Sequence, residues 1–269
     1  MLNVSIVLYN HSFAEVGLLV NTIRQVKCVG DIFLIDNSPI SANDFEQLPA
    51  NYIFIGKNVG YGSAHNIAIR KTIEQNTPYH LVVNPDIQFD SKILHELLDY
   101  MEKNTDVGHI MPKVLYPDGE IQYLCKLLPK PSDLFFRRFL PKKWTNKPNE
   151  KFELRESGYD KIMEVPYLSG CFMLLRTKAL EEAGLFDERF FLYPEDIDLT
   201  RRIHQKYKTI FYPNVSIVHH HARQSYKSAK FTRIHLRNLA KYFNKWGWFF
   251  DTERKEVNAR TLKKIRLNE

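Results

Sequence analysis

The stretch Val4–Asn10 (VSIVLYN) decides the fold class, because it is a mostly apolar run that ends in polar residues. A run of this kind is typical of a strand buried on both faces of a parallel sheet. Ser12–Glu15 (SFAE) then forms a capping box, which marks the start of a helix. The apolar residues that follow fall on one helical face, at Val16, Leu19, Val20 and Ile23. The chain is therefore predicted to open with a strand and an amphipathic helix.

The same alternation of strand and helix continues through the first half of the chain. Strands are predicted at residues 31–35, 52–55 and 80–83, and helices at 63–75 and in the segment that Ser91 caps. Alternation at this spacing favours an α/β fold with a Rossmann-like, mostly parallel, doubly wound sheet flanked by helices.

The second half has a different pattern. Residues 126–161 are rich in Pro, Lys and aromatic residues without a clear period, which indicates a long loop or lid with a short helix. Strand or helix character returns in five segments, at 165–176, 195–206, 209–212, 215–218 and 233–250. We expect one domain over residues 1–225 and a basic, aromatic-rich helical tail over residues 226–269.

The composition of the 269-residue chain narrows the class of protein. Hydrophobic residues make up 44% and charged residues 26%, which excludes a disordered, collagen-like or transmembrane chain. Cys28, Cys125 and Cys171 form no close pair in the sequence, which argues against a disulfide framework and fits a reducing cytosol. The N-terminus has no basic start and no small-residue cleavage site, so no signal peptide is predicted.

The net charge of +7 is concentrated at one end of the chain. Residues 226–269 contain twelve Lys or Arg and four Asp or Glu, whereas residues 1–225 contain 26 and 27. The basic tail also holds Trp246, Trp248, Phe249 and Phe250, a combination suited to an anionic membrane surface. Two other interpretations stay open: a solvated helical surface, or packing against the domain or a second subunit in a homodimer. Nucleic acid is not expected, because the tail has no motif that reads DNA or RNA.

Polar side chains gather where the predicted parallel strands end. They are Tyr9 and Asn10 after the first strand, Asp36 and Asn37 after the second, and Asn84 and Asp86 after the fourth. The loop Asn58–Gly62 precedes the helix that carries Asn66, and its glycines permit close backbone approach to a ligand. Each of these features alone could be a turn or a helix cap. Because ligands of open parallel sheets bind beyond the carboxyl ends of the strands, together they predict a pocket for a base, a ribose and a diphosphate.

Three short motifs carry candidate chemistry. Asp86 follows a buried strand and could bind a divalent cation or form an Asx turn. Glu195–Asp198 (EDID) could supply a base in a partly dry site or cap a helix N-terminus. His219–His221 follows a strand, so its first and last members share a face, either as metal ligands or as core and surface groups.

In combination these motifs resemble the family 2 inverting glycosyltransferases, especially the rhamnosyltransferase-like branch of the bacterial polysaccharide glycosyltransferases. The resemblance covers about residues 2–225 and depends most on Gly184–Glu188 (GLFDE) and Phe191–Leu199 (FLYPEDIDL). The other matching motifs are Val4–Asn10 (VSIVLYN), Ile35–Ser38 (IDNS), Asn58–Gly62 (NVGYG) with Asn66, Val83–Asp86 (VNPD), Leu168–Met173 (LSGCFM) and Arg202. The resemblance implies a GT-A fold.

The resemblance also implies a nucleotide-diphospho-sugar donor. The residues that it places on the donor side are Tyr9, Asp36, Asn37, Asn58, Gly60, Asn66, Asn84 and Asp86. Tyr9 would stack on the base, and Asp36 and Asn37 would line the pocket for base and ribose. Asn58 and Asn66 would shape the wall beside the nucleotide.

Catalytic and metal-binding residues follow from the same resemblance. Asp86, as the last residue of the family's Asp-x-Asp motif, would hold Mn or Mg, with His219 or His221 as a late ligand. Asp196 would be the general base that takes the proton from the acceptor hydroxyl. The residues on the acceptor side would be Glu195 and Gly170.

Two positions depart from the family pattern. Asn84 stands in place of the first acid of the Asp-x-Asp motif, as this branch often has it, so metal binding would depend more on Asp86, His219 and the diphosphate. Ala222 stands where many relatives have glycine, which leaves the geometry of that loop open.

The expected function is inverting transfer of a hexosyl or deoxyhexosyl group to a lipid-linked or oligosaccharide acceptor. Such a step belongs to capsule or O-antigen polysaccharide synthesis, at the cytoplasmic face of the membrane. One alternative is a sugar nucleotidyltransferase, which would show a Gly-rich loop with Arg and Lys where Tyr9–Ser12 (YNHS) stands. The other is a noncatalytic sugar-nucleotide-binding subunit, which would tolerate loss of the pair Glu195 and Asp196.

Overall fold

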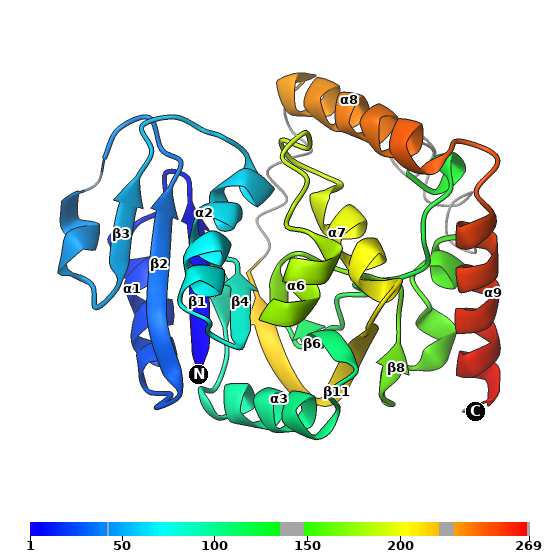
Figure 1. Ribbon diagram of the computed structural model, residues 1–269, viewed down its shortest axis with the longest axis horizontal. Coiled ribbons are helices and arrows are strands. Elements are labelled where there is room, and N and C mark those ends of the chain that lie inside the picture. Colours follow the sequence, from blue (N-terminus) through cyan, green and yellow to red (C-terminus); the bar gives the residue numbers. More distant parts are fainter. Residues whose placement is uncertain (42, 135–147, 221–228, 268–269) are drawn as a thin grey trace.

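The computed structural model describes residues 1–41, 43–134, 148–220 and 229–267 (Figure 1). In chain order the elements are β1 (Leu2–Leu8), α1 (Phe13–Arg24), β2 (Val29–Asp36), η1 (Asn43–Gln47), β3 (Asn51–Phe54), α2 (Tyr61–Glu74), β4 (Tyr79–Val83), β5 (Ile87–Gln88), α3 (Lys92–Lys103), β6 (Val107–Leu115), β7 (Cys125–Lys126), η2 (Arg155–Ser157), β8 (Met163–Glu164), β9 (Tyr167–Leu168), β10 (Phe172–Arg176), α6 (Thr177–Ala183), α7 (Glu195–His204), β11 (Lys208–His219), α8 (Ala229–Trp246) and α9 (Thr252–Leu267).

The described strands form one nine-stranded sheet and a small two-stranded one. Along the large sheet the order is β3-β2-β1-β4-β10-β6-β11-β5, with β8 beside β11. Strand β1 pairs in parallel with β2 and β4, β6 pairs in parallel with β11, and β10 runs antiparallel between β4 and β6. The predicted fold class, a mostly parallel sheet flanked by helices, is confirmed.

The opening strand and helix form as the sequence predicts. Every residue of β1 is buried, as a strand covered on both faces requires. At the start of α1, Ser12 Oγ accepts a hydrogen bond from the backbone N–H of Glu15, and a Glu15 carboxylate oxygen accepts one from the backbone N–H of Ser12. This capping box satisfies amide groups that would have no partner within the helix.

Three local predictions are wrong. Ser91 makes no capping hydrogen bond, and Asp90 Oδ1 instead accepts from the backbone N–H of Lys92 at 2.9 Å. The strands predicted at 209–212 and 215–218 are one strand, β11, whose register shifts where its pairing with β6 is interrupted. A strand predicted over 165–176 is two short strands, β9 and β10, separated by the turn that contains Gly170.

The C-terminal region contains two helices rather than one. Helix α8 ends at Trp246, and α9 begins at Thr252 after a turn at Gly247. Gly247 has φ +99°, and a Cβ there would lie 2.5 Å from the carbonyl oxygen of Phe250, so this tight turn requires glycine. Part of the loop or lid predicted over 126–161 lies outside the described residues.

Both C-terminal helices attach to α7. Arg201 of α7 is 2% exposed and donates two hydrogen bonds of 2.8 Å to the Asp251 carboxylate. Its guanidinium lies 4.0 Å from the ring centroid of Trp246, a cation–π distance. Asp198, also on α7, accepts hydrogen bonds from Trp246 Nε1 at 2.8 Å and Lys245 Nζ at 2.6 Å. The described part of the predicted tail therefore packs against the rest of the protein through buried charge.

We expect Arg201→Met to destabilise the protein by about 3–5 kcal/mol, because it leaves the Asp251 carboxylate buried without its main partner. The control Lys208→Met removes an exposed pair with Asp106 and should cost about 1 kcal/mol or less. Urea unfolding measures both values. Equal losses of unfolding free energy in the two variants would show that the buried pair contributes no more to stability than the exposed pair.

The Arg201–Asp251 pair should also make stability depend on pH. Burial alone would raise the pKa of Asp251, but hydrogen bonds from Arg201 and from the Arg254 backbone outweigh it, so the pKa is lowered. Because the folded-state pKa lies below the unfolded value of about 3.9, this stabilisation is present at neutral pH and is lost on acidification.

Candidate active site

A cavity of about 260 Å³ lies at the carboxyl ends of β1, β2 and β4. Its lining residues are Val7, Tyr9, His11, Asn37, Asn58, Gly60, Tyr61, Asn84, Pro85, Asp86, Phe191 and Leu192. The structure thus brings together six of the predicted donor-side residues, Tyr9, Asn37, Asn58, Gly60, Asn84 and Asp86. They lie at the sheet edge where open parallel sheets bind ligands.

The other two predicted donor-side residues lie behind the cavity rather than on it. Asp36 is fully buried, and its carboxylate accepts from the Ser38 backbone N–H at 2.8 Å and from the Tyr52 hydroxyl at 2.7 Å. Asn66 Nδ2 donates to the carbonyl of Phe186, and its Oδ1 accepts from the N–H of the same residue. Both side chains therefore hold loops in place, and their contacts leave little capacity for a ligand.

Gly60 joins the two sides of the cavity. Its φ is +95°, and a Cβ on it would lie 2.5 Å from the carbonyl oxygen of Phe191, so no other residue fits. The Gly60 N–H donates to Asn58 Oδ1 at 2.9 Å, and its carbonyl accepts from Asn37 Nδ2 at 3.2 Å. The neighbouring Tyr61 N–H donates to the carbonyl of Phe191 at 3.1 Å. The glycine loop thus holds the Phe191 segment directly against the end of the sheet that lines the cavity.

His219 is buried at the end of β11, and its Nε2 lies 3.4 Å from Asp86 Oδ1. Gln122 Nε2 donates to the carbonyls of His219 and Leu115, so Gln122 Oε1 faces His219 Nδ1 at 3.0 Å. Because an amide oxygen can only accept, Nδ1 carries a hydrogen, and Nε2 is the ring nitrogen that faces Asp86.

A carboxylate and an oriented imidazole nitrogen are suitable ligands for a divalent cation. Within the described ranges, however, no group of three His, Cys, Asp or Glu side chains is placed to hold a metal ion. A cation held by Asp86 and His219 would therefore depend on oxygen atoms of a bound diphosphate and on water. His220 is exposed, and His221 lies outside the described residues.

Glu195 and Asp196 are the first two residues of α7, which follows the Phe191 segment in the chain. Asp196 Oδ2 accepts from the Gly170 N–H at 3.0 Å, and Oδ1 accepts from the Ile197 N–H at 2.8 Å. Glu195 is 4% exposed, and its Oε2 has no hydrogen-bond partner among the described residues. A Cβ on Gly170 would lie 3.0 Å from Asp196 Cβ, so the glycine allows the close approach.

Burial changes the acidity of this pair. It raises the pKa of Glu195, with the neighbouring Asp196 charge as the second cause. Burial also raises the pKa of Asp196, and the Gly170 N–H opposes that shift. Backbone N–H donors favour the charged form of both acids, but only the pKa of Glu195 is raised further by the charge of its neighbour, so Asp196 is the member of the pair better suited to be ionised.

The third acid of the motif, Asp198, has a structural function. It is fully buried and accepts from Arg202 Nε at 2.9 Å in addition to Lys245 and Trp246. The sequence pattern alone does not distinguish Asp198 from its neighbours, because only the fold places α8 against it.

Three functional candidates are absent from the sequence-based prediction: His11, Tyr61 and Gln122. His11 Nδ1 accepts from the Tyr9 N–H at 2.9 Å, so in the neutral ring Nε2 carries the hydrogen and is a donor beside the cavity. Burial lowers the pKa of His11, partly offset by the charge of Asp86. The placement of Tyr61 between two glycines was the available signal for that residue; Gln122 had none.

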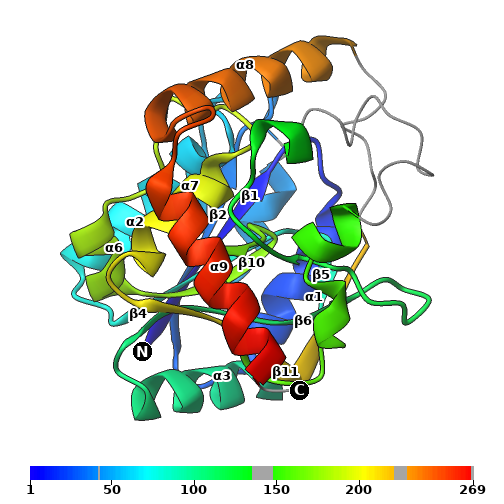
Figure 2. The same ribbon diagram turned by 90° about the vertical axis from the view of Figure 1, so that its right-hand side faces the viewer.

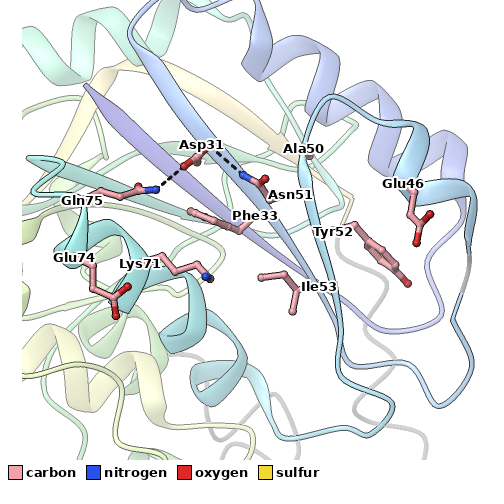
Figure 3. A pocket seen from close by; sticks show the side chains of 10 residues that line it. All are labelled: Asp31, Phe33, Glu46, Ala50, Asn51, Tyr52, Ile53, Lys71, Glu74 and Gln75. Carbon is pink, nitrogen blue, oxygen red and sulfur yellow. Dashed lines mark hydrogen bonds between the residues drawn. The ribbon is translucent and has the colours of Figure 1, made fainter.

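A larger hollow of about 640 Å³ lies toward the other end of the strands, the amino end (Figure 3). It is formed by the beginnings of β2 and β3 and the last turns of α2, where Asp31 accepts hydrogen bonds from Asn51 and Gln75. None of the predicted site residues lines it. Because it faces the amino ends of the strands, we assign the ligand site to the smaller cavity.

The fold is that of the GT-A glycosyltransferases. The mannosyltransferase PcManGT from Pyrobaculum calidifontis, solved in complex with GDP-Man and Mn2+, matches with a TM-score of 0.57 at 15% sequence identity. The match covers 91% of this chain and 63% of the mannosyltransferase. No model of a known protein family matches the chain.

Two sequence relatives are rhamnosyltransferases. The N-acetylglucosaminyl-diphospho-decaprenol L-rhamnosyltransferase of Mycobacterium tuberculosis is 28% identical over 179 residues, which are 63% of this chain and 58% of the relative. Rhamnosyltransferase WbbL of Escherichia coli K12 is 29% identical over 193 residues, 68% of this chain and 69% of WbbL. The resemblance to the rhamnosyltransferase-like branch is confirmed, although the chain spans only 58% of the length of the mycobacterial relative.

We expect Asp86→Ala to weaken binding of a nucleoside diphosphate in the presence of Mn by at least about tenfold, but to leave nucleoside binding nearly unchanged. The physical reason is that Asp86 lines the cavity 3.4 Å from His219 Nε2, and these two residues would hold the cation that binds the diphosphate. Calorimetry with UDP, GDP and the matching nucleosides measures both affinities. Asp99→Ala, an exposed change on α3, is the control. An equal loss for nucleoside and nucleotide would contradict the metal assignment.

Proposed function

We propose that this protein is an inverting glycosyltransferase that moves a sugar from a nucleotide-diphospho-sugar to an acceptor hydroxyl. The observation that carries the proposal is the Tyr61 hydroxyl. It hydrogen-bonds Asn84 in the donor cavity and the carbonyl of Gly170, whose N–H holds Asp196. One hydroxyl group thus connects the sheet edge proposed to bind the nucleotide with the buried carboxylate proposed as the base.

In the proposed reaction Asp196 takes the proton from the acceptor hydroxyl. The acceptor oxygen forms a bond to the anomeric carbon while the bond from that carbon to the diphosphate oxygen breaks. Attack opposite the leaving group inverts the configuration. The N–H groups of Gly170 and Ile197 orient the carboxylate, and Glu195, whose raised pKa keeps it protonated at lower pH, leaves the negative charge on its neighbour.

A divalent cation, Mn or Mg, is part of the proposal. Asp86 and His219 would hold it, and when bound it would stabilise the negative charge of the leaving diphosphate. The structural neighbour PcManGT, with GDP-Man and Mn2+ in its crystal structure, supports this assignment. Tyr9, which is half exposed at the cavity rim, is placed to stack on the nucleotide base.

The two rhamnosyltransferase relatives support a rhamnosyl group, which is a deoxyhexosyl group, as the transferred sugar. The name of the mycobacterial relative also describes a lipid-diphosphate-linked acceptor. We therefore propose a lipid-linked saccharide acceptor here, in the synthesis of a capsule or O-antigen type of polysaccharide. Both alternatives have less support. Tyr9–Ser12 (YNHS) stands where a nucleotidyltransferase would have its basic glycine loop, and Glu195 and Asp196 are both present.

We propose further that α8 attaches the protein to the anionic inner face of the membrane that carries such an acceptor. The helix has five Lys or Arg and no Asp or Glu, and Arg233 and Arg237, one turn apart, are exposed. Phe249 and Phe250, in the turn after it, are 76% and 95% exposed. Basic residues beside exposed aromatic rings favour the headgroup region of an anionic bilayer.

Helix α8 also lies at the end of the molecule toward which β1 runs, where the cavity is (Figures 1 and 2). Its Asn238 donates to the carbonyl of Leu192, a residue of the cavity wall. Attachment through this helix would thus bring the site toward the membrane. Within the described ranges, no helix is both long and apolar enough to cross a bilayer.

We expect Asp196→Asn to lower the rate of sugar transfer by about 10²–10⁴-fold, because the amide cannot accept the acceptor proton. Nucleotide affinity should change little, because Asp196 does not line the donor cavity. Transfer and donor hydrolysis are measured with a panel of nucleotide sugars, and Asp99→Asn is the exposed control. Turnover close to that of the unchanged protein would exclude Asp196 as the base.

For the membrane surface we expect co-sedimentation with anionic vesicles at low salt and release as ionic strength rises. Arg233→Glu with Arg237→Glu should abolish it. A charge-matched control, Lys92→Glu with Lys103→Glu, changes exposed residues of α3 at the opposite end of the molecule and should leave binding intact. No binding to any vesicle would assign the basic face to solvent or to a second copy, which sedimentation velocity distinguishes.

A further inference from the structure

Tyr61 connects the two halves of the site through a single hydroxyl group. Its oxygen lies 3.0 Å from Asn84 Oδ1 at the end of β4 and 2.7 Å from the carbonyl oxygen of Gly170. The Gly170 N–H in turn donates to Asp196 Oδ2 at 3.0 Å. Gly170 therefore links the two side chains: its carbonyl group accepts from the Tyr61 phenol, and its N–H donates to the Asp196 carboxylate.

The surroundings of Tyr61 hold it in this position. Its backbone N–H donates to the carbonyl of Phe191, and its ring packs edge-on against His65 with centroids 4.4 Å apart. His65 is itself held, because its Nδ1 lies 2.7 Å from Ser5 Oγ, which also contacts His80. A polar network inside the sheet thus supports the ring from behind, and the hydroxyl has one orientation in which to act.

The number of hydrogen atoms limits the possible bonding. A phenol has one hydroxyl hydrogen, but the Tyr61 hydroxyl lies within hydrogen-bond distance of two acceptors, Asn84 Oδ1 and the Gly170 carbonyl oxygen. When the Nδ2 and Oδ1 atoms of Asn84 exchange places, Nδ2 donates to the Tyr61 oxygen. Tyr61 then donates its one hydrogen to the Gly170 carbonyl, over the shorter of the two distances. The Tyr61 oxygen then accepts one hydrogen bond and donates one, and burial, which raises the pKa of Tyr61, keeps the phenol protonated.

We propose that Tyr61 is a positioning residue that aligns the Gly170 peptide, and through it Asp196, and that Asn84 makes this possible by donating to the phenol. The proposal depends on Asp196 being the base. It also accounts for the amide at the first position of the Asp-x-Asp motif. A carboxylate at position 84 could only accept, so it would compete with the Gly170 carbonyl for the single hydrogen of Tyr61.

The test is a double-mutant cycle of Tyr61→Phe and Asn84→Asp, with transfer measured at saturating donor and acceptor. Tyr61→Phe should lower kcat by about tenfold while the donor KM stays within about twofold, as expected for loss of one orienting hydrogen bond. In the wild-type background Asn84→Asp should lower kcat by a similar factor. In the Tyr61→Phe background it should lower kcat little further. Tyr212→Phe, which loses a hydroxyl contact with Glu96, is the matched control.

A second measurement does not require turnover. Loosening of the Gly170 N–H removes a donor that favours the charged carboxylate, so Tyr61→Phe should raise the pKa of Asp196. Carboxyl-carbon NMR follows that pKa in the resting protein, and the acid limb of the kcat profile should move to higher pH with it.

Each result has a defined meaning. An unchanged Asp196 pKa in Tyr61→Phe, an effect confined to donor KM, or independent effects of the two substitutions would overturn the positioning assignment. Absence of transfer by the unchanged protein with every nucleotide sugar would instead reject the glycosyltransferase proposal, while the NMR shift would still decide whether Tyr61 aligns Asp196.

Discussion

The buried Arg201–Asp251 pair is the interaction on which the candidate site most depends. Arg201 lies on α7, whose first residues are Glu195 and Asp196, and its bidentate bond joins that helix to the start of α9. Trp246 covers the guanidinium and donates to Asp198 on the same helix. A charge of this kind cannot shift without losing partners in a low-dielectric interior, so it fixes the position of α7.

Steric room for the backbone is the second constraint, and it acts within the site. Gly60 and Gly170 each lie where a Cβ would meet another chain segment, at 2.5 Å and 3.0 Å. These close approaches allow backbone N–H and carbonyl groups to replace side chains as partners of Asn58, Tyr61 and Asp196. Two short glycine turns thus place the Asp196 carboxylate close behind the sheet edge that lines the cavity.

Much of this arrangement could be predicted from local patterns. The apolar run of β1 and the capping box of α1 involve neighbours in sequence, and both appear as expected. The polar residues at the strand ends also meet, since parallel strands bring their carboxyl ends to one edge. Tertiary partners could not be predicted: Asp36 accepts from Tyr52, and Asn66 donates to the Phe186 carbonyl. The cap predicted at Ser91 was wrong for a local reason, because the neighbouring Asp90 makes that hydrogen bond.

By itself, the sequence determined the α/β class, the sheet edge that carries the polar residues, and the motifs that resemble the rhamnosyltransferase-like glycosyltransferases. Such features depend on residue type and spacing along the chain. Only the tertiary structure decided that Asp198 is structural while Asp196 faces Gly170, that His219 presents Nε2 to Asp86, and that Trp246 covers Arg201. Those outcomes depend on which of several similar polar groups is desolvated and by which neighbour, and the neighbours are far away in sequence.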